Sequence, residues 1–351
     1  RLYYLKTKNR TAAINFIRKE GFSTAHDDLN SYYRVVCRDY LTTFSNWAVM
    51  ENYAKATQVD LLKGDAFRVD IKDFKAYTGE LTSDMLRDKS MSMCHDSETW
   101  SPDGDLPRPE KPKDCIFCLG VTFQWVHDKE PLLKVCFCDY PTNARPGYLS
   151  VVCGTETNIL KAFSEVYAKL KPEFIFGFND SDYDWPWIVK RASQTKGTLI
   201  KLAENFDATK PYQQYTDDSV MKFNYKKEHV KVEATAYVDG FSLMMHGYIP
   251  VDVRTIFRQL YPTAEQSSLK WFLAKNKLGG KEDMPYERLF DIYRRYREFM
   301  EAHGWNKNNP DVRAGKMIDL DTDSLTDEEK ETYNTLKSEL GEVNSYCVVD
   351  A

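Results

Sequence analysis

The chain has 351 residues, of which 42% are hydrophobic, and its formal net charge is −5. This length exceeds one average domain, so we expect two domains, and the acidic balance excludes a generally basic nucleic-acid coat while allowing a local basic groove. No apolar run approaches the length of a membrane span, so we expect no membrane segment. The first residues are charged, lack a secretory pattern and contain no initiating Met, which favours a fragment of a longer protein.

Residues 1–90 are predicted to form a small mixed α/β domain. Apolar side chains at helical spacing in residues 11–20, followed by Gly21, predict a helix. Three stretches rich in aromatic and apolar residues are predicted strands: 2–6, 31–40 and 47–53. A fold of this order with surface aromatics can bind single-stranded nucleic acid, but we interpret these aromatics as core.

Residues 91–98 alternate in polarity and are predicted to form a strand. Its period of two places Asp96 and Glu98 on one face. Because neighbouring carboxylates repel each other, this face requires neutralising cations or screening water. Taken alone, the D-x-E pattern is typical of a solvated sheet edge.

Residues 116–125 and 132–138 are the predicted strands of a hairpin, with a C-x-x-C pair, Cys115 and Cys118, at its start. Residues three apart in a strand face opposite ways, whereas a zinc knuckle needs a tight turn and a second ligand pair, so we do not expect zinc here. The chain's eight cysteines lie among apolar residues without a small secreted framework, which favours a reducing compartment.

The stretch after this hairpin places a carboxylate at the start of a helix. An amphipathic helix is predicted at residues 157–170, followed by a short buried strand at 174–176. Residues 179–184 are crowded with polar groups, and Pro186 favours a helix beginning near Asp184. This order of strand, hairpin, helix, strand and helix indicates an α/β layer arrangement. Alone, Asp184 is best interpreted as a helix cap.

The remaining elements are a projecting hairpin and several helices. Residues 219–237 alternate in polarity around Lys226 to His229, which predicts a hairpin with a basic tip. The predicted helices are 251–260, 268–275, 286–303 and a final helix that ends the chain. In that last helix Tyr346 and Asp350 are four residues apart and therefore share a face.

The acids together indicate a chemistry that none of them indicates singly. Four carboxylates from three elements, Asp96, Glu98, Asp184 and Asp350, can hold two divalent cations, as two-metal phosphodiester hydrolysis requires. The sequence has no competing serine or cysteine nucleophile pattern and no G-x-x-x-x-G-K phosphate loop.

In this arrangement the chain resembles the proofreading exonuclease domain of family B DNA polymerases. Residues 96–99 resemble the first exonuclease motif of that family, residues 179–184 the second and residues 346–350 the third, and the tyrosine marks the DEDDy class. The resemblance extends to the asfarvirus-type branch of giant-virus replicative polymerases, through these segments: 31–38, 177–188, 250–254, 259–262 and 346–351.

The resemblance implies a ribonuclease H-like fold, a mixed sheet with flanking helices, over residues 91–351, behind a partial polymerase N-terminal domain at residues 1–90. It implies two cations, Mg²⁺ or Mn²⁺. Asp96 would bridge both cations. Glu98 and Asp350 would hold the cation that activates water, and Asp184 would support the other.

Further roles follow from the same resemblance. Thr99, Asn179 and Tyr183 would lie at the terminal nucleotide, and the 219–237 hairpin would help to separate primer from template. Tyr346, a phenol with an unperturbed pKa of about 10, would orient the attacking water rather than act as a base. One departure is Ser97, where the family usually has a bulky apolar residue. Because Ser97 points away from Asp96 and Glu98, we expect it to affect packing more than chemistry.

The expected partners are a single-stranded DNA 3′ end or a primer–template, and the remaining polymerase domains, since the palm is not in this chain. We expect an intracellular monomer, in the host cytoplasm (at a viral factory) or the nucleus, with no membrane partner. Two alternatives stay open: a non-catalytic nucleic-acid-binding module, against which the full acid set argues, and a free-standing 3′–5′ exonuclease acting on RNA.

Overall fold

The computed structural model describes residues 7–22, 32–42, 46–55, 67–87, 90–207, 215–233, 235–279, 284–316 and 319–351. The chain divides into two compact units, the first ending at Leu86 and the second running from Arg87 to Ala351. In the described part of the chain, none of the helices combines the length and apolar character needed to cross a membrane.

The first unit contains short elements, in this order: α1 (Thr7–Lys19), α2 (Tyr32–Tyr40), β1 (Ala48–Met50), β2 (Ala54–Lys55), β3 (Phe67–Arg68), η2 (Ile71–Asp73), β4 (Phe74–Ala76) and α3 (Ser83–Leu86). The helix predicted at residues 11–20 is confirmed as α1, and the strand at 47–53 as the shorter β1. The strand predicted at residues 2–6 lies outside the described residues.

The strand predicted at residues 31–40 is wrong, because this stretch forms helix α2. The adjacent valines at positions 35 and 36 favour a strand by local propensity. However, the apolar residues at positions 33, 36, 37 and 40 recur at the spacing of one helix face, and this periodicity fits the structure.

The second unit is built on a six-stranded mixed sheet, with strand order β12-β9-β5-β6-β7-β8. Its strands are β5 (Met91–Trp100), β6 (Cys115–Trp125), β7 (Leu133–Cys138), β8 (Leu149–Val152), β9 (Phe174–Gly177) and β12 (Ile249–Asp252). β6 runs antiparallel to both neighbours, β5 and β7, whereas β5, β9 and β12 are mutually parallel. The predicted hairpin of β6 and β7 and the predicted strands β5 and β9 are confirmed.

Helices cover both faces of this sheet. The helices of the second unit, in chain order, are α4 (Glu156–Leu170), α5 (Asp184–Gln194), α6 (Thr198–Phe206), α7 (Asp217–Ser219), η3 (Val220–Asn224), α8 (Val253–Leu260), α9 (Leu269–Lys275), α10 (Tyr286–Ala302), α11 (Pro310–Arg313), η4 (Thr322–Ser324) and α12 (Asp327–Asp350). One apolar core joins the sheet to α4, α5 and α6, around Phe163 and Trp185. The second joins the other face to α10 and α12, around Phe117 and Tyr293. This arrangement confirms the predicted mixed sheet with flanking helices.

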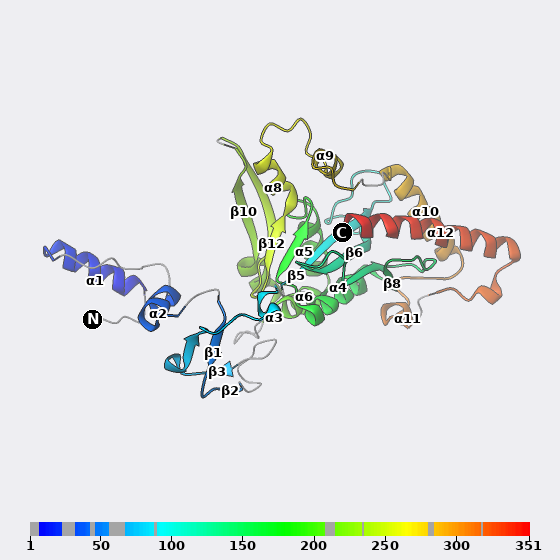
Figure 1. Cartoon of the computed structure of the whole chain (residues 1–351). Helices are drawn as coiled ribbons and strands as arrows, with labels where there is room; N and C mark the ends of the chain where they lie inside the picture. Colours follow the sequence, from blue (N-terminus) through cyan, green and yellow to red (C-terminus); the bar gives the residue numbers. More distant parts are fainter. Residues whose placement is uncertain are drawn as a thin grey trace. The chain divides into compact units, whose positions relative to one another are not determined.

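Strand β5 separates the two cores because its side chains alternate between them. Met91, Met93, His95, Ser97 and Thr99 are buried on one side, whereas the residues between them are half-buried on the other side. Asp96 and Glu98 therefore share one face, as the period of two predicted, and the structure shows that this face is the α12 side of the sheet. Figure 1 shows α12 ending beside β5 and β6.

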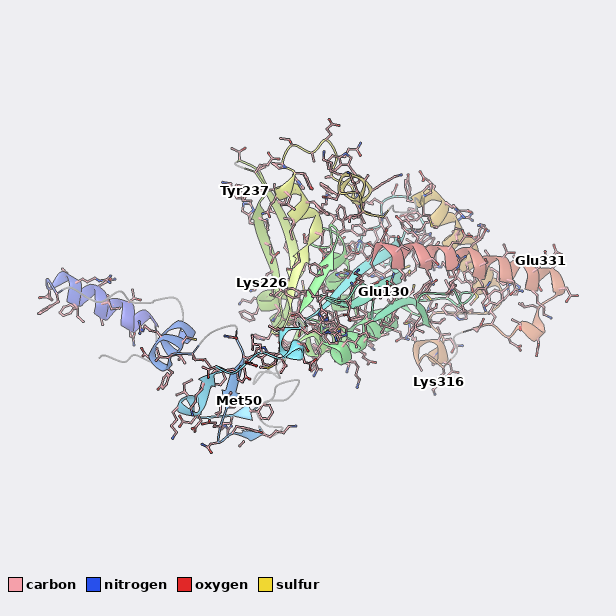
Figure 2. All side chains as sticks on the ribbon, viewed as in Figure 1. Met50, Glu130, Lys226, Tyr237, Lys316 and Glu331 are labelled. Atoms are coloured by element: carbon pink, nitrogen blue, oxygen red, sulfur yellow. The ribbon has the colours of Figure 1, made fainter. Side chains whose placement is uncertain are left out.

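A second, two-stranded sheet forms a hairpin from β10 (Tyr225–Lys231) and β11 (Tyr237–Leu243). The predicted hairpin is present, but the expectation that Lys226 to His229 form its tip is wrong, because these residues pair within β10. Figure 2 shows Lys226 and Tyr237 toward opposite ends of the hairpin. The stretch has no Gly, Pro or Asn at 226–229 to make a turn, so the strand continues through it.

Helix α12 approaches β6 closely at Gly120. A Cβ added at Gly120 would lie 2.7 Å from the backbone oxygen of Cys347 and 2.9 Å from its carbonyl carbon. Only a residue without a side chain allows this approach, which is one recognised role of glycine inside a strand.

We expect Gly120→Ala to lower the free energy of unfolding by about 1–3 kcal/mol, because the new methyl group overlaps backbone atoms that cannot move independently. Urea unfolding of the whole chain measures this. Gly279→Ala is the matched control, since a Cβ there would meet nothing within 4 Å. A Gly120→Ala protein as stable as the Gly279→Ala control would contradict the close approach of the Cys347 backbone to Gly120.

Candidate active site

Asp96 and Glu98 form the centre of the candidate site. Both are half-buried on β5, which has an irregularity in its pairing with β6 directly after Glu98. Their carboxylate oxygens and the Cys347 Sγ atom all lie within 4.8 Å of one another. The structure thus brings the predicted first motif against the helix that carries the third.

Cys347 anchors that helix at the site. Its Sγ accepts a hydrogen bond from the Gly120 N–H at 3.1 Å and donates to the Asp96 carbonyl oxygen at 3.4 Å. Gly120 and Asp96 are register partners in the β5–β6 pair, so α12 contacts both strands at one point. Tyr346 immediately precedes this anchor and Asp350 follows one turn later, both half-buried.

Asp184 reaches the opposite side of β5. It is the first residue of α5, and the cap position is Tyr183, which makes no side-chain cap bond. The Asp184 Oδ1 atom instead accepts hydrogen bonds from the Ser97 N–H, at 3.1 Å, and from the Ser97 hydroxyl. Asp184 is therefore not the helix cap that its local sequence indicates, and it is not in the group formed by Asp96, Glu98 and Cys347.

These bonds show that Ser97 has a polar partner as well as apolar neighbours, while its effect on chemistry stays a prediction. Ser97 does point away from Asp96 and Glu98, but the side it points to holds Asp184. No sequence pattern distinguishes that contact from simple burial, because it depends on where α5 begins relative to the end of β9.

Tyr183 and Thr99 share one wall of a pocket of about 440 Å³. The Thr99 Oγ1 and Tyr183 hydroxyl oxygen are 2.5 Å apart. Burial, together with the negative charges of nearby acids that include Asp184 and Glu98, raises the pKa of Tyr183 to about 12. The phenol therefore stays protonated at neutral pH and is a hydrogen-bond donor.

The rest of this pocket gives it an apolar character beside the acids. Glu98 is among its polar lining residues, and Leu106, Tyr286 and Phe290 are among its apolar ones. A flat apolar ring system with polar groups at its edge, such as a nucleobase, suits such a lining.

Asn179 does not line that pocket. Its backbone adopts a left-handed conformation, with φ at 68°, and its N–H donates to Asp252 Oδ1 at 3.1 Å. Its side-chain Oδ1 accepts from the Arg254 guanidinium at 2.5 Å. The structure therefore holds the Asn179 side chain against the start of α8, while the Asn179 carbonyl accepts a hydrogen bond from the Tyr183 N–H at 3.0 Å.

The loop between β9 and α5 is also tied to the hairpin. The Ser181 hydroxyl donates to Asp252 Oδ2 at 2.5 Å, and the Ser181 carbonyl accepts from the Phe241 N–H of β11 at 2.6 Å. Gly240 permits this contact, because a Cβ there would lie 2.3 Å from the Ser181 hydroxyl oxygen. Sequence reasoning missed the roles of Asp252 and Arg254, although both lie in the 250–254 segment that carries the family resemblance.

A second pair of buried polar groups lies on the face of β5 that carries Ser97. His95 Nε2 and Asp180 Oδ2 are 3.5 Å apart with both side chains almost fully buried. Burial raises the pKa of Asp180 above its usual range. It also raises the pKa of Asp184 to about 6, an effect that the neighbouring His95 and the Ser97 hydroxyl partly oppose.

The donors on the α12 side suit a hard divalent cation. Carboxylate oxygens are the ligands that Mg²⁺ and Mn²⁺ prefer. Burial raises the pKa of the Cys347 thiol, so it remains protonated, whereas a soft metal requires a thiolate. Asp96 and Glu98 thus fit a Mg²⁺-type ion better than zinc.

The six-stranded mixed sheet with flanking helices is that of a ribonuclease H-like domain, as predicted, and comparison with known sequences identifies the family. The profile of the DNA polymerase family B exonuclease domain matches residues 31–250. The chain therefore belongs to this family, as its motifs predicted.

Three viral relatives support this membership. "DNA polymerase beta" of an African swine fever virus isolate is 33% identical over 295 residues, which cover 84% of this chain and 23% of the relative. "DNA polymerase 037L" of Invertebrate iridescent virus 6 is 26% identical over 219 residues, covering 59% of this chain and 16% of the relative. "DNA polymerase" of Phaeocystis pouchetii virus is 24% identical over 210 residues, covering 56% and 20%. The matched region spans about a quarter or less of each relative.

The raised pKa of Asp184 predicts how stability depends on pH without metal. A carboxyl with a pKa of about 6 in the folded chain and 3.8 in the unfolded chain contributes stability that is fully present below pH 3.8 and is lost as the pH rises through about 6. We expect wild type in EDTA to lose on the order of 2–3 kcal/mol between pH 4 and 7 relative to Asp184→Asn.

Urea unfolding of both proteins across this pH range measures the difference. Asp180 is present in both proteins, and its negative charge contributes to the raised pKa of Asp184, so the difference reports the titration of Asp184 beside Asp180. Parallel pH profiles for the two proteins would contradict a buried, ionisable Asp184.

Proposed function

We propose that this chain carries the 3′–5′ proofreading exonuclease of a viral DNA polymerase, and that it releases nucleotides from a DNA 3′ end. The observation that supports this most directly is the meeting of Asp96 and Glu98 with α12 at Cys347, next to a pocket with apolar walls. Family membership supports the nuclease class, and the direction of hydrolysis and the DNA substrate are our proposal.

Four carboxylates would hold two divalent cations, Mg²⁺ or Mn²⁺. Asp96 would contact both, Glu98 and Asp350 one of them, and Asp184 the other. When bound, such cations lower the pKa of a water molecule and stabilise the leaving oxygen of a phosphodiester. Burial raises the pKa of the Asp184 carboxyl, so its ionised form needs a neutralising cation.

The remaining residues bind and orient. The protonated Tyr183 and its partner Thr99 would hold the sugar or phosphate edge of the terminal nucleotide, with the base against Tyr286 and Phe290. Tyr346 would orient the attacking water by a hydrogen bond, which is a positioning effect. Asn179 would act indirectly, since Arg254 engages its side-chain oxygen and so fixes the loop that leads to Asp184.

We further propose that the first unit belongs to the polymerase N-terminal domain and that the β10–β11 hairpin helps to separate primer from template. The hairpin carries lysines and an exposed tyrosine, groups that suit a nucleic-acid strand. The partners would be primer–template DNA and the other polymerase domains. Viral relatives and eight free cysteines support an intracellular location.

The test is metal-dependent release of mononucleotides from a 3′-labelled single-stranded DNA. We expect activity with Mg²⁺ or Mn²⁺, none with EDTA, and none for the double change Asp96→Ala with Glu98→Ala. Because clustered carboxylates repel each other, that variant should unfold in EDTA at the same or a slightly higher temperature than wild type.

The matched control is Glu328→Ala with Glu331→Ala, which removes two exposed carboxylates from the other end of α12 (Figure 2). It should retain full activity. An intact DNA 3′ end would favour the binding-module alternative, and faster hydrolysis of RNA than of DNA would favour the free-standing RNA exonuclease.

Tyr346 and Asp350 should differ in what they contribute. Tyr346→Phe removes one hydrogen bond to water and should lower the rate roughly ten- to a hundredfold, with DNA binding nearly unchanged. Asp350→Ala removes a cation ligand and should leave almost no activity. Single-turnover hydrolysis and DNA-binding assays measure both. Equal loss in the two variants, or full activity of Tyr346→Phe, would contradict the role of this tyrosine.

A further inference from the structure

Strand β5 continues past the end of its parallel neighbour β9. The two strands pair through Ser92, Met93 and Cys94, whereas β5 itself extends to Trp100. Beyond Cys94, the backbone groups on the β9 side of β5 do not pair with β9 and are available to other partners. The N–H of Ser97 is one of these, and the Asp184 carboxylate takes the place of a strand carbonyl as its acceptor, at 3.1 Å.

The Ser97 hydroxyl donates to the same carboxylate oxygen. The contact is buried, since Ser97 is 6% exposed and Asp184 3% exposed, so little water competes for it. Among the residues that the structure describes, none donates a hydrogen bond to the other oxygen, Asp184 Oδ2. One residue thus supplies both donors to one oxygen and leaves the second oxygen to other partners.

Two hydrogen-bond donors restrict the orientation of a carboxylate more than one donor does. The terminal torsion of an aspartate is broad, so a single hydrogen bond allows the carboxylate plane to rotate about it. A second donor from another direction to the same oxygen restricts that rotation. The backbone N–H is present whatever residue occupies position 97, but the second donor exists only because this residue is a serine.

We propose that Ser97 is a positioning residue, which fixes Asp184 Oδ1 on β5 so that Oδ2 is the ligand atom for a divalent cation. This inference rests on the proposed function, in which Asp184 is a cation ligand. In this proposal Ser97 is not itself a cation ligand, and it acts through Asp184.

The test measures binding of Mn²⁺ alone to the whole chain, without DNA, by the electron paramagnetic resonance signal of the free ion. The variants are Ser97→Ala, which keeps the backbone N–H and loses the hydroxyl, and Ser97→Thr, which keeps the hydroxyl. Ser92→Ala is the matched control, because the Ser92 hydroxyl on the same strand donates to the Gln124 carbonyl at 3.0 Å and not to an acid. Asp184→Ala identifies the Mn²⁺ site concerned.

We expect Ser97→Ala to weaken Mn²⁺ binding at the Asp184-dependent site by about three- to tenfold, the equivalent of one hydrogen bond. Ser97→Thr should restore the affinity and Ser92→Ala should leave it unchanged. In an Asp184→Ala background, adding Ser97→Ala should cause no further loss, since a double-mutant cycle isolates the coupling of the two residues. Should Ser97→Ala fail to fold, Ser97→Cys, with a weaker donor, gives the same comparison.

Wild-type affinity in Ser97→Ala would overturn the positioning role, and so would an equal loss in the presence and absence of Asp184. Failure of the proposed function would give a different result. The wild type would then not hydrolyse DNA, and the Asp184→Ala variant would bind as many Mn²⁺ ions as the wild type. The role of Ser97 would fail together with the proposed function.

Discussion

The site depends on the close approach of α12 to the sheet at Gly120. A helix normally packs on a sheet through its side chains, but here the backbone of Cys347 lies where a Cβ of the strand residue would be. The Cys347 sulfur then bonds to β6 through the Gly120 N–H and to β5 through the Asp96 carbonyl. The acids of β5 and the final turn of α12, which are about 250 positions apart in the chain, are thereby fixed at a single point.

The acids on the two sides of β5 are in different environments, half-buried on one side and fully buried on the other. On the α12 side, Asp96 and Glu98 are half-buried and can share a cation with water still present. On the other side, Asp184 and Asp180 are buried in an apolar core, where an ionised carboxylate is costly unless it is bonded or paired. His95 and Ser97 reduce that cost from the same strand. One strand therefore presents its acids on one face and the groups that compensate buried acids on the other.

Much of the second unit follows from local patterns. The period of two in β5 places Asp96 and Glu98 on a common face, and helical spacing places Tyr346 and Asp350 on a common face. The patterns failed where two periods compete, as in α2, and where a strand continues through charged residues, as at Lys226 to His229. Local propensity is a weak prior in both cases: helical periodicity prevails in α2, and strand pairing prevails in β10.

The relation of Asp184 to Asp96 could not come from a pattern, because it depends on where two elements end. β9 stops at Gly177, and the polar loop that follows is held by Asp252, Arg254 and the β11 backbone before α5 begins. The left-handed conformation of Asn179 costs free energy, and these hydrogen bonds offset it. The second motif, residues 179–184, is thus recognised less by Asp184 itself than by the residues that anchor its loop. Its sequence signal is accordingly spread over residues 177–188 and 250–254, whereas Asp184 alone resembles an ordinary helix cap.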